Sequence, residues 1–226
     1  MKSKSGYRTK KQNVKTARGR TNSSVSWLRR NINDPYVKMA KQEGYVSRAA
    51  FKLLQIEEKF KIIKKSSSII DLGAAPGGWL QVLSALKKEN GLIVGVDLIN
   101  ISISLPDVVL IKGDFLDDEI QDNIISLLSS SPDLIVSDMA TAAVGDRGLD
   151  HIRNSELVNM VIDFAERHLK EKGSMIIKTI RGGEEAAILK KCKGMFSKVK
   201  LFKPDSSYSE SAEIYIISLN RLCDAR

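Results

Sequence analysis

Charged side chains recur in this sequence at the points where apolar segments end. One of them is a lysine inside the apolar run MIIKTIRGG, residues 175–183. A buried ammonium group is costly unless it is paired or loses its proton. In an open parallel sheet the carboxyl ends of the strands lie together, and ligands bind there. We therefore predict one binding site at this edge, with the lysine at its mouth; the charged residues concerned are Asp71, Asp97, Asp114, Asp138 and Lys178.

The stretch DLGAAPGGW, residues 71–79, is the most specific of these signals. Glycines at a strand-to-helix turn allow a ligand to approach the backbone and the helix N-terminus. The G-x-G-x-x-G fingerprint of dinucleotide sites is broken here, because Ala75 replaces the middle glycine and Pro76 follows it. Asp97 is placed to bind both hydroxyls of a ribose, as in enzymes that use NAD or S-adenosylmethionine (SAM). Asp114 is placed either to bind an adenine amino group or to cap the next helix.

The segments that carry these residues alternate between strand and helix patterns. Runs rich in Val, Ile and Leu alternate with stretches whose apolar residues have helical spacing. Such strands are typical of a parallel sheet covered on both faces, so we predict a single α/β domain. The predicted strands span 66–73, 92–98, 107–114, 132–140, 174–180, 198–203 and 212–220, and the predicted helices span 78–91, 117–130, 150–173 and 183–196.

A helical pattern also precedes the first strand, within residues 34–63. Its apolar face is expected to contain Ala50, Leu53, Leu54 and Ile56, with Ser47 as the N-cap.

Positive charge is concentrated at the start of the chain. The protein has 226 residues and a net charge of +9, and its first thirty residues contain no acid. We predict that residues 1–26 form a disordered basic arm and that residues 27–226 form the folded domain. Basic arms commonly lie along phosphate backbones, although a solubilising tail is the alternative.

Several classes of protein are disfavoured by composition. Two cysteines without metal-ligand spacing predict no metal site and a reducing compartment, which we take to be the cytoplasm. No apolar run is long enough for a membrane span, and no apolar segment follows the basic start as in a secretory signal. A minor alternative is that this basic start is an organellar transit peptide, which would place the protein in mitochondria.

Six motifs in order resemble the FtsJ/RrmJ-type RNA 2′-O-ribose methyltransferases: SRAAFKL, DLGAAPGGW, KGDF, SDMA, IIKT and KPDSS…SAEIYIISL. The resemblance covers about residues 27–219. It implies a Rossmann-like SAM-dependent fold with a mostly parallel seven-stranded sheet, whose last strand is antiparallel and inserted beside its neighbours. It also implies SAM as cofactor; the predicted cofactor-binding residues are Gly73, Pro76, Gly77, Gly78, Trp79, Asp97, Asp114 and Asp138.

The same resemblance implies a catalytic tetrad of Lys52, Asp138, Lys178 and Glu213. Lys178 would meet the ribose 2′-hydroxyl opposite the SAM methyl group. A free lysine has a pKa of about 10.4, so a base role requires that nearby cations and desolvation lower it. We favour that role, and a cationic Lys178 that orients the hydroxyl is the alternative. The family usually has proline and asparagine after SDMA, in a loop that borders the acceptor nucleotide, whereas this chain has Thr141 and Ala142.

In its compact length, the chain resembles the members of this family that modify a uridine in the A-loop of 23S ribosomal RNA, in the large ribosomal subunit. We expect a monomer whose phosphate contacts come from Arg29, Arg30, Lys38, Lys41 and Arg48. Methylation of tRNA is an alternative within the family. A catalytically idle RNA-binding assembly factor is disfavoured by the intact tetrad. An NAD-dependent oxidoreductase is disfavoured by the broken fingerprint and by the basic arm.

Overall fold

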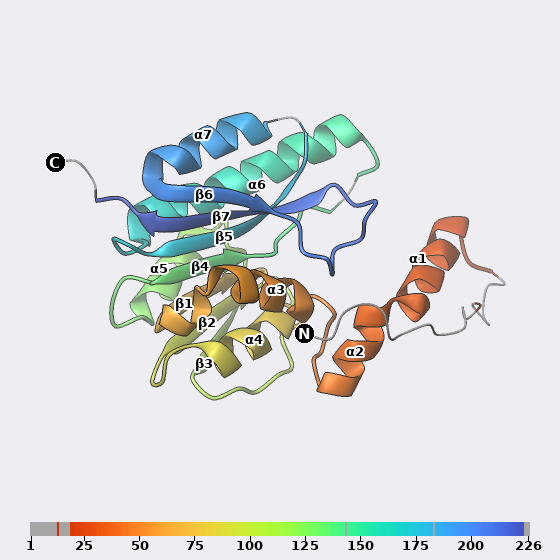
Figure 1. Ribbon diagram of the computed structural model, residues 1–226, viewed down its shortest axis with the longest axis horizontal. Coiled ribbons are helices and arrows are strands. Elements are labelled where there is room, and N and C mark those ends of the chain that lie inside the picture. Colours follow the sequence, from red (N-terminus) through yellow and green to blue (C-terminus); the bar gives the residue numbers. More distant parts are fainter. Residues whose placement is uncertain (1–12, 14–18, 143, 183, 224–226) are drawn as a thin grey trace.

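A seven-stranded sheet forms the centre of the protein (Figure 1). The computed structural model describes residues 13, 19–142, 144–182 and 184–223. The strand order is β3-β2-β1-β4-β5-β7-β6, and β7 alone runs opposite to the other six strands. This confirms the predicted fold class, including the inserted last strand. The strands are β1 (Ser68–Leu72), β2 (Leu92–Asp97), β3 (Val108–Lys112), β4 (Leu134–Ser137), β5 (Ser174–Ile180), β6 (Phe196–Phe202) and β7 (Glu213–Arg221).

Helices cover both faces of the sheet. Helices α3 (Ala50–Phe60) and α4 (Gly78–Leu86) pack on one face, and α5 (Asp118–Ser126), α6 (Arg147–His168) and α7 (Glu185–Met195) pack on the other (Figure 1). Neighbouring strand residues alternate between the two cores, as Ile69 and Ile70 do. Each such side chain contributes about 1.5–3 kcal/mol when it is fully buried. None of the described helices is both long and apolar enough to cross a membrane.

The strand order creates a crevice at the carboxyl end of β1. The chain proceeds from β1 to β2 and β3 on one side, and then returns to place β4 on the other side of β1. The segments that leave β1 and β4 therefore diverge, which is where ligands bind in such sheets. Gly73 follows β1 and Asp138 follows β4, so the predicted site residues stand at this crevice.

The N-terminal region differs from the sequence prediction in two respects. Helix α1 (Asn22–Asn33) begins inside the predicted arm, with Thr21 as its N-cap. The predicted boundary at residue 27 therefore falls within α1, and most of the arm before α1 lies outside the described residues. The stretch 34–63 also forms two main helices, because Gly44, at a φ of 78°, ends α2 (Pro35–Glu43).

The predicted N-cap at Ser47 is wrong. Helix α3 begins after Ala49, which makes no side-chain capping bond. The Ser47 hydroxyl is instead buried against Gly78 at the start of α4, where an added Cβ would lie 2.4 Å from it. Close packing between α4 and the turn before α3 explains the small residue at each position.

Candidate active site

Four charged side chains from distant parts of the chain meet at the crevice. Lys52 Nζ lies 2.8 Å from Glu213 Oε1 and 3.8 Å from Asp138 Oδ2. Lys178 Nζ lies 3.0 Å from Asp138 Oδ1, and it also donates to the backbone carbonyl of Asp138. The exposed fractions of the four side chains lie between 12% and 19%, so they are largely shielded from bulk water yet reachable. The structure thus brings together all four residues of the predicted tetrad.

Strand register explains how Lys178 and Glu213 reach one face of the sheet. Lys178 of β5 pairs with Tyr215 of β7, and Glu213 lies two residues before Tyr215. Because side chains alternate along a strand, all three project from the same face. This is the face on which α3 packs, and α3 supplies Lys52. Asp138 enters from the segment that follows β4.

Tyr215 is a fifth member of the cluster that the sequence reasoning missed. Its buried hydroxyl donates to Asp138 Oδ1 at 2.7 Å and approaches Glu213 Oε1 at 3.4 Å. Burial, reinforced by the charges of Asp138 and Glu213, raises the pKa of Tyr215 well above its ordinary value, which keeps the hydroxyl a donor. The alternation of the final strand placed Tyr215 beside Glu213, and that pattern was the available signal.

The loop between β6 and β7 holds Glu213 from its other side. Ser207 Oγ donates to Glu213 Oε1 at 2.8 Å. The loop is itself tied to α3, because Gln55 Oε1 accepts hydrogen bonds from the amide and the hydroxyl of Ser206, each at 3.0 Å. The Glu213 carboxylate therefore accepts hydrogen bonds from both Lys52 and Ser207, which fixes its orientation.

A cavity of about 510 Å³ adjoins the tetrad at the ends of β1, β2 and β4. Gly73, Asp97, Asp114 and Asp138 are among its lining residues. Asp97 Oδ2 accepts from the Ala75 amide at 2.8 Å and Oδ1 from the Ile99 amide at 2.9 Å, so the carboxylate is held in place at the rim.

The cavity has two properties expected of a site for a cationic adenosyl ligand. Gly73 has a φ of 77°, and an added Cβ would lie 2.4 Å from Met139 Cγ, so only glycine leaves the loop in this position. Asp71 is completely buried beneath it, and no described residue hydrogen-bonds either of its carboxyl oxygens. Burial, with the nearby charges of Asp138 and Asp97, raises the pKa of Asp71 well above its ordinary value. A positively charged ligand nearby would relieve this concentration of acidic groups.

Comparison with known proteins settles the family. Residues 45–221 match the family described as FtsJ-like methyltransferase. The chain belongs to this family. It is also 47% identical to the ribosomal RNA large subunit methyltransferase E of Rickettsia bellii and 46% identical to that of Rickettsia felis, over 96% of this chain and 97% of each relative. The predicted family and the predicted methyltransferase are thereby confirmed.

Solved structures agree with this assignment to the FtsJ-like family. A Plasmodium falciparum protein described as a ribosomal RNA methyltransferase is 30% identical, with a TM-score of 0.70 over 79% of this chain and 99% of that one. Fibrillarin from Aeropyrum pernix, solved with bound S-adenosyl-L-methionine, has a TM-score of 0.57 over 77% of this chain and 75% of its own. At 17% identity it shows the fold alone.

Within this FtsJ-like domain, four of the eight predicted cofactor residues line the cavity and four do not. Gly77 and Gly78 form the start of α4, directly after Pro76, and so shape the loop. The Trp79 side chain does not line the cavity: it is buried in the core, and its Nε1 donates to the Ala49 carbonyl at 2.9 Å. Asp114 lines the cavity while its Oδ1 accepts from the Leu116 amide, and the N-cap of α5 is Asp117.

Arg48 also has a different environment from the one expected of a phosphate contact. Its guanidinium lies 2.7 Å from Asp34 Oδ2, 3.9 Å from the centre of the Tyr208 ring, and within bonding distance of the Ser206 carbonyl. These partners make Arg48 a link between the N-terminal helices and the β6–β7 loop. Arg29, Arg30 and Lys41 are exposed on α1 and α2, and Lys38 is half-buried.

The loop after Asp138 lies on the cofactor side of the tetrad. Thr141 and Ala142, the two departures from the usual family pattern, line the cavity that contains Asp97 and Asp114. Arg153 of α6 donates to the Ala142 carbonyl at 3.3 Å and holds the loop there. The structure thus places both departures at the cavity that contains Asp97 and Asp114, and a contact of this loop with the acceptor nucleotide stays a prediction.

Proposed function

We propose that this protein methylates a ribose 2′-hydroxyl of large-subunit ribosomal RNA, with SAM as the methyl donor. The observation that carries the proposal is the convergence of Lys52, Asp138, Lys178 and Glu213 beside the cavity at the ends of β1, β2 and β4. A tetrad of this composition next to a carboxylate suited to a ribose argues against a protein that only binds RNA. The broken dinucleotide fingerprint at Ala75 argues equally against an NAD enzyme.

The cavity residues have distinct tasks toward the cofactor. When bound, SAM supplies an electrophilic methyl group. Asp97 would hold the ribose hydroxyls of its adenosyl part, Asp114 the adenine amino group, and the backbone at Gly73 its amino-acid part. The carboxylates of Asp97 and Asp138, whose charges raise the pKa of the buried Asp71, provide a negative environment for a cationic ligand.

Lys178 acts on the acceptor hydroxyl. Its Nζ is held by two acceptors, the carboxylate and the carbonyl of Asp138, and an ammonium or amine so held keeps a further position for the hydroxyl. As a neutral amine it takes the hydroxyl proton while the oxygen gains the methyl group. As an ammonium it orients the oxygen, and the proton leaves late. Either role depends on alignment, and positioning of well-oriented reactants contributes up to about 7–11 kcal/mol.

Lys52 and Glu213 complete the charge balance around this oxygen. Lys52 bridges Glu213 and Asp138, so the two cations of the tetrad are interleaved with its two anions. Lys52 approaches Asp138 Oδ2, whereas Lys178 contacts Oδ1 of the same carboxylate. The tetrad can then present donors to a developing oxyanion without leaving a net charge that would have to be solvated.

The substrate follows from the names of the relatives and from the charge of the chain. Relatives at 46–47% identity are named for large-subunit ribosomal RNA, and the net charge of +9 favours binding to a polyanion. We propose a uridine of the 23S A-loop in the large subunit as the acceptor. Phosphate contacts come from Arg29, Arg30 and Lys41, and the site of action is the cytoplasm.

Mapping of 2′-O-methyl groups in cellular RNA, with and without this protein, tests the proposal. We expect one ribose methyl group in large-subunit ribosomal RNA to disappear when the protein is absent and to return when it is supplied. Loss of a methyl group from tRNA, or from a base, would refute the proposed substrate. An unchanged methylation map would refute the enzyme assignment.

A further inference from the structure

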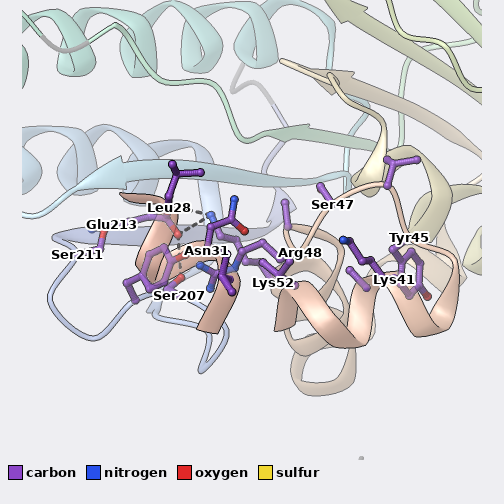
Figure 2. A pocket seen from close by; sticks show the side chains of 16 residues that line it. Leu28, Asn31, Lys41, Tyr45, Ser47, Arg48, Lys52, Ser207, Ser211 and Glu213 are labelled. Atoms are coloured by element: carbon purple, nitrogen blue, oxygen red, sulfur yellow. Dashed lines mark hydrogen bonds and ion pairs between the residues drawn. The ribbon is translucent and has the colours of Figure 1, made fainter. Parts of the chain in front are cut away.

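A second cavity, of about 670 Å³, lies on the other side of the tetrad. Its walls come from α1, α2, the segment that leads into α3, and the β6–β7 loop. Figure 2 shows Glu213 and Ser211 on one side of this cavity and Lys41 and Tyr45 on the other. The volume falls within the roughly 300–1,000 Å³ of small-molecule sites in proteins.

The two cavities meet at the tetrad. Lys52 and Glu213 line the second cavity, whereas Asp138 lines the first, and Lys52 Nζ lies 3.8 Å from Asp138 Oδ2. Methyl transfer requires donor and acceptor to approach from opposite sides of the reacting oxygen. Because the carboxylates that suit an adenosyl group line the first cavity, the acceptor must approach from the second.

The lining of the second cavity suits a nucleobase. Tyr45 supplies an aromatic ring, and Val46 and Leu28 supply apolar contacts. Asn31 of α1 and Ser211 of the β6–β7 loop add polar groups that can bond the edge of a base. Lys41 is exposed at the rim, where a phosphate would pass. Proteins that recognise single bases of RNA combine stacking, edge hydrogen bonds and cations in this way.

We infer that this cavity, which we name the acceptor pocket, receives the base of the nucleotide to be methylated after that base has left its stack. The inference rests on the proposed function. The tetrad side chains are no more than 19% exposed, so a ribose inside a regular helix could not bring its 2′-hydroxyl to them. Extrusion of the nucleotide solves this problem, as it does for enzymes that modify bases, at the cost of lost stacking.

Val46→Trp is the variant that tests the acceptor pocket. Val46 is 46% exposed at the rim, and its amide donates to Gln81 Oε1 at 2.8 Å, so the backbone should keep its position while the indole fills the pocket. Leu127→Trp is the matched control, because Leu127 is 36% exposed next to α5 and lines neither cavity.

The assay measures methylation of large ribosomal subunits from cells that lack this protein, together with SAM affinity by calorimetry. We expect Val46→Trp to lower kcat/KM for the subunits by about tenfold or more, mainly through KM, with SAM affinity within twofold of wild type. Leu127→Trp should behave as wild type. Asn31→Ala, which keeps the cavity open, should lower kcat/KM about two- to tenfold, as expected for one lost hydrogen bond.

The results separate the acceptor pocket from the proposed function. Wild-type kinetics for both Val46→Trp and Asn31→Ala would overturn the pocket and leave the proposed function intact. A wild-type enzyme that does not methylate the subunits would overturn the proposed function, and the pocket with it. If Val46→Trp loses SAM binding through misfolding, the test of the acceptor pocket rests on Asn31→Ala. A normal kcat/KM in Asn31→Ala would then refute the proposed role of the pocket.

Discussion

Removal of the Tyr215 hydroxyl should weaken catalysis and leave binding intact. The hydroxyl donates to Asp138 Oδ1 at 2.7 Å from a buried position, and Lys178 donates to the same oxygen at 3.0 Å. A hydrogen bond to a charged group contributes about 1.5–3 kcal/mol. Without it, Asp138 is held by the two lysines alone. If that energy is lost from the transition state, kcat for Tyr215→Phe should fall by about 10- to 150-fold, since about 1.4 kcal/mol corresponds to tenfold.

Steady-state methylation of large ribosomal subunits measures this effect, with SAM affinity determined separately. We expect Tyr215→Phe to keep its SAM affinity within twofold, because the ring remains in the core and contacts Trp79 at 5.8 Å between ring centres. Tyr36→Phe is the matched control, because among the described residues its hydroxyl accepts one hydrogen bond, from Gln55 Nε2 at 3.3 Å. A Tyr215→Phe enzyme with wild-type kcat would refute the role assigned to this hydrogen bond.

Three further predictions concern other parts of the molecule. Gly73→Ala should weaken SAM binding tenfold or more in calorimetry, whereas Gly44→Ala, with a similar φ but open space around it, should not; equal effects would refute a specific role for the glycine at the cavity. Burial alone would raise the pKa of Asp133, but hydrogen bonds from Ser67, Lys170 and Ser68 lower it to about 2. Because the folded-state pKa is depressed, this carboxylate stabilises the fold above about pH 4, and its contribution, about 1–2 kcal/mol after allowance for solvent screening, is lost as the pH falls toward 2. Asp133→Asn should therefore lower the free energy of unfolding at pH 7 and flatten its decline in acid, and an unchanged acid profile would contradict this. Deletion of residues 1–18 should weaken RNA binding and reduce its salt dependence without changing SAM affinity; unaltered RNA affinity at fixed salt would show that the arm is only a tail.

The sheet and the tetrad could be predicted because their signals are local. An apolar run in the sequence predicts each strand. Because parallel strands have their carboxyl ends at the same edge of the sheet, the meeting of Asp138 and Lys178 follows from the pairing. The family motifs then added Lys52 and Glu213, whose places on a helix and a last strand carry no chemical signal of their own.

Contacts between distant segments could not be predicted in the same way. Arg48 resembles any basic residue of an RNA-facing helix, and only the fold brings the Ser206 carbonyl and the Tyr208 ring to it. Trp79 sits in the most recognisable motif, yet packing between α3 and α4 turns its ring into the core. The same is true of Ser47, which meets Gly78 of α4 instead of capping α3. In each case a tertiary contact overrides what the local sequence favours.

The position of the second cavity also depends on the fold alone. Its walls combine α1 and α2 with a loop about 170 residues later in the chain, and no sequence pattern joins them. The salt bridge between Arg30 and Glu210, at 3.8 Å, lies across the same junction.

Methylation of large ribosomal subunits with SAM labelled in its methyl group, by wild-type enzyme and by Lys178→Ala, shows whether the tetrad directs the methyl group to a ribose hydroxyl. After digestion of the RNA to nucleosides, we expect wild-type enzyme to place the label on a ribose 2′-oxygen. The Lys178→Ala rate should be lower by about a hundredfold or more, the usual share of a positioned proton acceptor, with SAM affinity unchanged. Label on a base, or a Lys178→Ala rate close to that of wild type, would contradict the account.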